Sequence, residues 1–215
     1  MPAFHKIDLE NWNRKASYEH YSAAVPCTYS MTVNLDITSF LQQVKQNKLP
    51  FFASVLYGIS HAVNQHSEFR MDVDADGNLG YYDGCNPCYT VFHPECETFT
   101  NVWTQYDADF AQFLQNYKAD MAQYQADATQ SKPLPDSNVF NVSCIPWTSF
   151  TGFNLNLQKG YDYYLPIFTI GKYFTEGDKV LLPLAIQVHH AVCDGYHLAR
   201  WIDELQRWMS SFSKG

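Results

Sequence analysis

The sequence from residue 180 to residue 197 reads VLLPLAIQVHHAVCDGYH. Residues 180–188 are almost continuously apolar, which predicts a central β-strand that is buried on both faces. His189 and His190 follow directly, an Asp-Gly pair stands at 194–195, and a helix is predicted from residue 197 to about 211. Glycine permits a sharp backbone turn between such elements. The stretch therefore places polar groups where a buried strand ends, a position well suited to meeting a ligand.

The two histidines indicate an acid–base site or a structural core histidine, and the residues alone leave both interpretations open. An imidazole titrates near neutrality and can take up a proton at working pH. The spacing of His190 and Asp194 also suggests a dyad in which the aspartate orients the ring. A serine or cysteine nucleophile is less favoured, because the chain has no glycine-flanked nucleophile elbow.

Strands and helices alternate irregularly along the rest of the chain. Residues 28–35 alternate as a strand, a short helix over 39–45 follows a capping Asp36 or Thr38, and Pro50 opens an apolar helix to about residue 65. Residues 107–127 have apolar side chains at helical spacing. We expect residues 1–215 to form a single domain of mixed α/β (α+β) class.

Composition excludes several classes of function. Hydrophobic residues make up 46% of the chain and aromatic residues 16%, which supports a packed core. The formal net charge of −8 disfavours nucleic acid as a partner. No secretory leader and no membrane-spanning apolar run is visible, so a cytoplasmic protein with six reduced cysteines is expected.

Residues 72–83 match most ligand positions of a calcium-binding EF-hand loop. An EF-hand requires a helix after the loop, whereas residues 84–87 read Gly-Cys-Asn-Pro and precede a predicted strand. We therefore favour a β-hairpin with its turn at 76–77, where the sequence is Asp-Gly.

Cysteines at 85, 88 and 96 and a histidine at 93 resemble a small zinc knuckle. Residues 88–93 have the composition of a strand, in which five steps separate the end side chains by roughly 16 Å. Ligands of one zinc ion lie about 2.3 Å from it. We therefore predict buried thiols and no metal.

Residues 189–195 resemble the H-H-x-x-x-D-G signature of chloramphenicol acetyltransferases and of the acyltransferase cores of 2-oxo acid dehydrogenase complexes. Further segments are similar to the first of these families and occur in order along the chain: 11–14, 25–27, 89–93, 97–99, 146–147, 153–156 and 178–183. The oxo-acid enzymes also carry lipoyl and subunit-binding modules, for which 215 residues leave no space.

The resemblance implies a two-layer sandwich of a mixed β-sheet with helices, as in CoA-dependent acyltransferases. It also implies a homotrimer with active sites at subunit interfaces. The catalytic histidine and most of the antibiotic pocket would then come from different subunits. Acetyl-CoA would be a co-substrate, and no permanently bound cofactor is implied.

Residue roles follow from the same resemblance. His190 is the general base, Ser143 donates to the tetrahedral oxyanion, and Thr169 holds an ordered water. Arg14 and Asp194 form a buried ion pair that supports the site, which replaces the dyad suggested by spacing alone. Tyr173 lines the CoA tunnel. The remaining matched positions line the substrate pocket: Tyr21, Cys27, Thr90, Phe99, Phe153 and Leu155.

The expected activity is O-acetylation of chloramphenicol at its primary hydroxyl, which inactivates the antibiotic and confers resistance. Two alternatives stay open. One is a non-catalytic binding protein that sequesters an aromatic ligand, and the other is an acyltransferase of related fold that uses another alcohol as acceptor.

Overall fold

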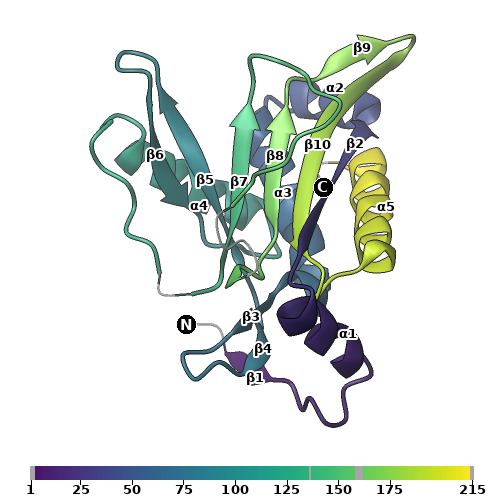
Figure 1. The fold of residues 1–215 in the computed structure, drawn as a ribbon. Coiled ribbons are helices and arrows are strands. Elements are labelled where there is room, and N and C mark those ends of the chain that lie inside the picture. Colours follow the sequence, from purple (N-terminus) through teal and green to yellow (C-terminus); the bar gives the residue numbers. More distant parts are fainter. Residues whose placement is uncertain (1–2, 136, 158–161, 214–215) are drawn as a thin grey trace.

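The computed structural model describes residues 3–135, 137–157 and 162–213. Figure 1 shows a twisted β-sheet with helices packed along one side and a long segment crossing the other. The elements in chain order are β1 (Phe4–Lys6), α1 (Lys15–Glu19), the π-helix η1 (His20–Ala24), β2 (Thr28–Asp36), α2 (Thr38–Gln46), α3 (Phe51–Gln65), the 3-10 helix η2 (Ser67–Phe69), β3 (Met71–Val73), β4 (Leu79–Tyr82), β5 (Asn86–His93), β6 (Thr98–Trp103), α4 (Phe110–Tyr124), β7 (Val139–Ile145), β8 (Ile167–Gly171), β9 (Phe174–Glu176), β10 (Lys179–His189) and α5 (Gly195–Ser211).

The main sheet is mixed, as expected. Among the described residues its strands run in the order β2-β10-β8-β7-β5-β6, and β9 pairs with the first three residues of β10. β10 is antiparallel to β2 and β8, whereas β7 is parallel to both β8 and β5. A small separate sheet contains β1, β4 and β3. None of the helices in the described part of the chain has both the length and the apolarity needed to cross a membrane.

β10 is the central strand that the sequence predicts. All its residues from 181 to 189 are buried, and it pairs with β2 along nine residues. Leu184 and Ile186 lie in the main core, whereas Ala185 and Gln187 face a narrow cavity on the opposite side of the sheet. Burial on both faces explains why β10 shows no apolar–polar alternation.

The helices cover one face of the sheet and complete two layers. α3 is apolar on most sides and lies between the sheet and the outer helices, with ten of its 15 residues buried. Gly58 allows the Trp208 ring of α5 to lie directly against α3, because a β-carbon at this glycine would come within 2.4 Å of the indole. α5 begins at Gly195, earlier than predicted, because Asp194 caps it by accepting from the His197 N–H.

The acidic loop after β3 is a hairpin turn, as the sequence indicates. Gly77 takes a left-handed conformation with φ of 81°. Asp74 Oδ1 accepts hydrogen bonds from the N–H groups of Asp76 and Asn78 at 3.0 and 2.8 Å. The carboxylate therefore stabilises the turn itself. The predicted strand over 88–93 is likewise confirmed as part of β5.

α2 ends in a Schellman motif with an unusual residue at its left-handed position. The N–H of Leu49 bonds to the carbonyl of Val44 at 2.9 Å, and the N–H of Lys48 bonds to the carbonyl of Lys45 at 3.1 Å. Lys48 occupies the position usually taken by glycine and has a φ of 52°. A side chain with a β-carbon is strained in this conformation.

Replacing Lys48 with glycine therefore raises the free energy of unfolding by about 0.5–1 kcal/mol, since glycine adopts positive φ without steric cost. Guanidinium chloride unfolding at fixed protein concentration measures this change. The matched control, Lys45→Gly inside the last turn of α2, lowers stability by about 1 kcal/mol. A loss of stability in Lys48→Gly would contradict the assignment of strain.

Candidate active site

His190 is the first residue after β10, at the end of the strand next to β2. Its backbone N–H donates to the carbonyl of Cys27 at 3.1 Å, one residue before β2 begins. The last ladder pair between the two strands is His189 with Thr28. The backbone of His190 is therefore held by the continuation of the central β10–β2 ladder.

Aromatic packing orients the His190 ring. Tyr21 of η1 stacks on it with ring centroids 3.8 Å apart and an interplanar angle of 9°. Tyr29 of β2 meets it edge-on at 5.2 Å. Nδ1 of His190 is buried and has no hydrogen-bond partner among the described residues, whereas the residue as a whole is partly exposed. Nε2 is therefore the nitrogen that can reach a substrate. The contact of Tyr29 with His190 was not predicted from the sequence, although the alternating strand that carries Tyr29 was.

Asp194 interacts with Arg14 rather than with His190. Arg14 Nη2 lies 3.4 Å from Asp194 Oδ2, and Nη1 donates to the carbonyl of Val192 at 2.5 Å. No hydrogen bond or ion pair joins Asp194 to His190 within the described ranges. The expected pair is present, but it is not buried within a single chain, because the Asp194 side chain is 38% exposed while that of Arg14 is 14% exposed. Water screens a pair of this kind, so breaking it costs less than breaking a fully buried one.

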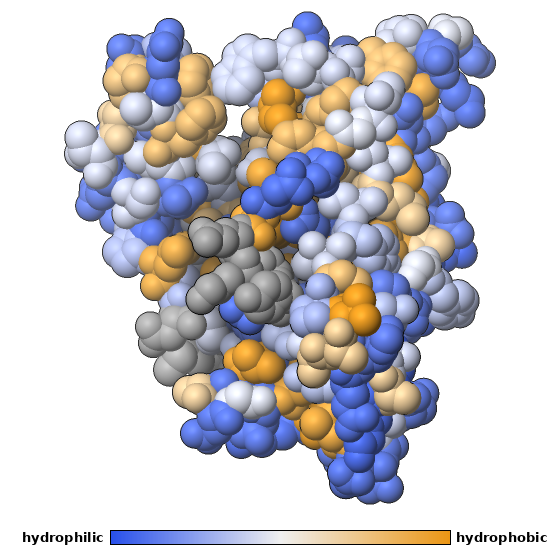
Figure 2. Space-filling model, viewed as in Figure 1, coloured by the Kyte–Doolittle hydropathy of each residue, from blue (hydrophilic) through white to orange (hydrophobic). Residues whose placement is uncertain are grey.

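A second group of expected site residues lies together on the open face of the sheet. A cavity of about 250 Å³ is lined by six of them: Thr90, Phe99, Ser143, Phe153, Leu155 and Thr169. The segment after β7 covers this face, where the N–H of Phe153 donates to Thr32 Oγ1 at 3.3 Å and the N–H of Leu155 donates to Gln187 Oε1 at 3.1 Å. Figure 2 shows this face, with apolar surface over the β5–β6 hairpin. Phe92 and Phe99, which pair across that hairpin, are both exposed.

An adjoining cavity of about 330 Å³ shares Thr90, Ser143 and Leu155 with the first. Sequence reasoning gave no role to the polar residues that line its far side. Asn141 Nδ2 donates to the hydroxyl of Tyr163 at 2.8 Å there. Asn141 stands two residues before Ser143 on β7, so strand periodicity alone places both on one face.

Within one chain, His190 and the residues of the Ser143 cavity lie far apart. Ser143 of β7 pairs with Thr169 of β8, and Thr169 pairs with Ala185 of β10, so the three lie in one row across the sheet. His190 lies five residues beyond Ala185, which is roughly 17 Å along an extended strand. The imidazole therefore cannot meet the Ser143 hydroxyl of the same chain.

Tyr173 lies apart from both groups. It occupies the turn between β8 and β9, and its ring packs edge-on against Phe51 at the start of α3, with centroids 5.4 Å apart. The side chain is exposed. This position leaves the ring free to contact a ligand at the end of the sheet where β8 finishes.

The thiols beside the key residues are not activated. Burial raises the pKa of Cys193, three residues after His190, to about 12. Burial also raises the pKa of Cys144, next to Ser143, to about 11. Both thiols are therefore protonated near neutrality and are poor nucleophiles. No three His, Cys, Asp or Glu side chains are grouped as metal ligands in the ranges that the structure describes.

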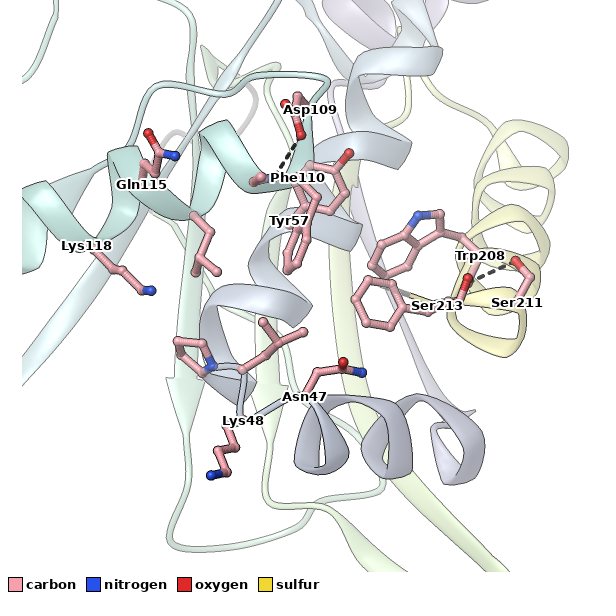
Figure 3. A pocket seen from close by; sticks show the side chains of 15 residues that line it. Asn47, Lys48, Tyr57, Asp109, Phe110, Gln115, Lys118, Trp208, Ser211 and Ser213 are labelled. Carbon is pink, nitrogen blue, oxygen red and sulfur yellow. Dashed lines mark hydrogen bonds between the residues drawn. The ribbon is translucent and has the colours of Figure 1, made fainter. Parts of the chain in front are cut away.

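A larger cavity, of about 650 Å³, lies on the helical side of the molecule. Figure 3 shows it between the α2–α3 turn, the first half of α4 and the end of α5, with Tyr57, Phe110 and Trp208 on its apolar wall and Lys48 and Lys118 at its edge. None of the expected catalytic or substrate-binding residues lines it. We therefore assign the candidate site to the sheet face that carries Ser143, although the cavity on the helical side has the larger volume.

Curated relatives are similar over nearly the whole chain. A chloramphenicol acetyltransferase of Clostridium perfringens is 53% identical over 209 residues, covering 97% of this chain and 99% of that protein. One of Campylobacter coli is 52% identical, covering 94% and 97%, and one of Escherichia coli is 46% identical, covering 97% and 95%.

Solved structures share the fold. A chloramphenicol acetyltransferase aligns with a TM-score of 0.87 at 24% identity, covering 96% of this chain and all of that one. A dihydrolipoamide acetyltransferase of Azotobacter vinelandii aligns with a TM-score of 0.63 at 18% identity, covering 91% and 86%. The family model described as chloramphenicol acetyltransferase matches residues 2–206. The chain therefore belongs to the chloramphenicol acetyltransferase family.

Proposed function

We propose that this protein transfers an acetyl group from acetyl-CoA to the primary hydroxyl of chloramphenicol and so confers resistance to the antibiotic. The observation that carries the proposal is the imidazole of His190 just after β10, which stacks on Tyr21 and meets Tyr29 edge-on. The chain that carries it is 53% and 52% identical in sequence to two chloramphenicol acetyltransferases. Acetyl-CoA is a co-substrate in this scheme, and no resident cofactor takes part.

The chemistry is direct acyl transfer. His190 Nε2 removes the proton from the acceptor hydroxyl as that oxygen attacks the thioester carbonyl. The Ser143 hydroxyl donates to the oxyanion of the tetrahedral intermediate, and a water held by Thr169 supports it. Collapse breaks the carbon–sulfur bond, and the CoA thiolate takes the proton back from His190. General-base help contributes typically about 10²–10⁴-fold, and one oxyanion donor about 10²–10³-fold.

The substrates enter from opposite sides. The apolar side chains of the Ser143 cavity suit an aromatic acceptor, with Thr90, Phe99, Phe153 and Leu155 as its walls. Tyr21 and Cys27 would close the acceptor site from the His190 side. Tyr173, exposed at the β8–β9 turn, would line the tunnel for the CoA arm.

We further propose that the active protein is a homotrimer of this single acetyltransferase domain. The separation of His190 and Ser143 along the sheet supports shared sites, because a second copy must bring its Ser143 cavity to the first copy's imidazole. A cyclic arrangement of three copies gives each site one histidine and one serine. We place the trimer in the cytoplasm, where acetyl-CoA is available and free cysteines persist.

Two alternatives are distinguished by one assay. A binding protein that only sequesters an aromatic ligand releases no free CoA when chloramphenicol and acetyl-CoA are mixed with it. An acyltransferase with another acceptor releases CoA with that alcohol and not with chloramphenicol. Thiol-specific detection of free CoA, with and without chloramphenicol, is therefore the experiment that tests the proposal.

Replacing His190 with alanine lowers kcat by about 10²–10⁴-fold, because one imidazole carries the proton in both directions. The variant folds and assembles as the wild type does, which circular dichroism and sedimentation check. Retention of more than about a tenth of the wild-type rate would rule out His190 as the base.

Replacing Ser143 with alanine lowers kcat more than it raises KM, because the hydroxyl acts on charge that develops in the transition state. Steady-state kinetics over both substrates separate the two constants. A raised KM at unchanged kcat would assign Ser143 to ground-state binding instead.

Co-refolding the His190→Ala and Ser143→Ala chains in equal amounts restores about a quarter of the wild-type sites. Half of the chains can supply an intact His190 and half can supply an intact Ser143, and a complete site needs both from two neighbouring chains. Activity and sedimentation at three times the 24.8 kDa chain mass are measured together. The control mixes the two variants after each has folded alone, which leaves activity low. Co-refolded trimers as inactive as either variant would contradict sites built from two chains.

A further inference from the structure

Titratable side chains from three separate segments meet behind the turn that follows His190. Arg14 precedes α1, Glu68 lies in η2, and Asp194, His197 and Arg200 belong to the start of α5. They form two ion pairs, in which Arg14 Nη2 lies 3.4 Å from Asp194 Oδ2 and Arg200 Nη2 lies 3.3 Å from Glu68 Oε1.

His197 lies between the two pairs and contacts both. Its Nδ1 is 2.9 Å from Asp194 Oδ1, and its Nε2 is 3.5 Å from Glu68 Oε1. The ring is largely buried, with a side chain 13% exposed. It is the one side chain of this cluster that reaches the carboxylates of both ion pairs.

The capping box of α5 gives each ring nitrogen its own neighbour. The backbone N–H of Asp194 donates to His197 Nδ1 at 3.2 Å, and Nε2 faces Glu68. Burial lowers the pKa of His197, although Asp194 and Glu68 act in the opposite direction; Arg14 and Arg200 add to the lowering. A neutral ring also leaves the two cations and two anions around it balanced.

The cluster reaches His190 through the backbone. Arg14 Nη1 donates to the carbonyl of Val192 at 2.5 Å. The N–H groups of Val192 and Cys193 both donate to the carbonyl of His189, at 3.2 and 3.0 Å. The guanidinium that pairs with Asp194 thus also fixes the tight turn that immediately follows His190.

We propose that His197 is a positioning residue for the acetyl transfer: by accepting from the Asp194 N–H, it holds Asp194 against Arg14 and thereby fixes the turn that aims the His190 imidazole. This inference rests on the proposed function of His190. A role confined to capping α5 would change stability alone, whereas positioning changes kcat at temperatures where every variant is folded.

The test compares substitutions that keep or remove the acceptor for the Asp194 N–H. His197→Gln keeps it, because a glutamine at the third position of a helix accepts from the N-cap N–H in a capping box. His197→Leu keeps much of the side-chain volume but has no acceptor. His197→Ala removes both the volume and the acceptor.

We expect His197→Ala and His197→Leu to lower kcat about tenfold with KM for both substrates within twofold, since a displacement near 1 Å costs up to 10²-fold. His197→Gln keeps at least half the wild-type kcat. All assays are run well below the melting temperature of each variant. Wild-type kcat in the alanine variant, or equal losses in the leucine and glutamine variants, would overturn the proposal.

A second readout does not depend on turnover. The ring signals of His190, identified in NMR spectra of histidine-labelled protein by their loss in His190→Ala, shift in His197→Ala and His197→Leu and stay in place in His197→Gln. If the wild type releases no CoA, the proposed function fails, and these spectra still decide the positioning role. Unmoved His190 signals in the alanine and leucine variants would refute it. If His197→Ala does not fold, the leucine and glutamine pair gives the same decision.

Discussion

The pairing of β10 with β2 is the constraint on which the rest of the structure depends. Nine consecutive residue pairs join the two strands, and β10 is buried along nearly its whole length. Because side chains alternate along a strand, this register sends Ile186 into the core and Gln187 to the open face. A slip by one residue would exchange these faces and displace His190 from the carbonyl of Cys27.

In the proposed mechanism, the long rigid strand has a consequence for catalysis. His190 lies just beyond one end of it, while the row that contains Ser143 and Thr169 crosses it in the middle. A sheet cannot fold back on itself over so short a distance, so one chain presents His190 and Ser143 on different parts of its surface. In that mechanism oligomerisation is part of the chemistry, because a second copy must bring its Ser143 to each histidine.

The environment of His190 also shows how an imidazole can be oriented without a carboxylate. Stacking on Tyr21 and edge contact with Tyr29 restrict the ring, and the backbone is fixed through Arg14 and Val192. Within the part of the chain that the structure describes, no carboxylate pairs with this ring. The aspartate that sequence spacing suggests as a partner instead holds the turn and caps α5.

The sequence by itself determined the buried strand that ends just before His190, the helices over 51–65 and 195–211 to within two residues, and the hairpin at Gly77, because each depends on local periodicity or on a backbone conformation that only certain residues favour. Family resemblance added the roles of His190 and Ser143, which remain predictions. Only the tertiary structure decided that Tyr21 and Tyr29 both contact the His190 ring and that the Arg14–Asp194 pair is partly exposed on the Asp194 side. The physical reason is that these contacts join residues far apart in the chain, so they depend on strand register and helix packing, which no local pattern encodes.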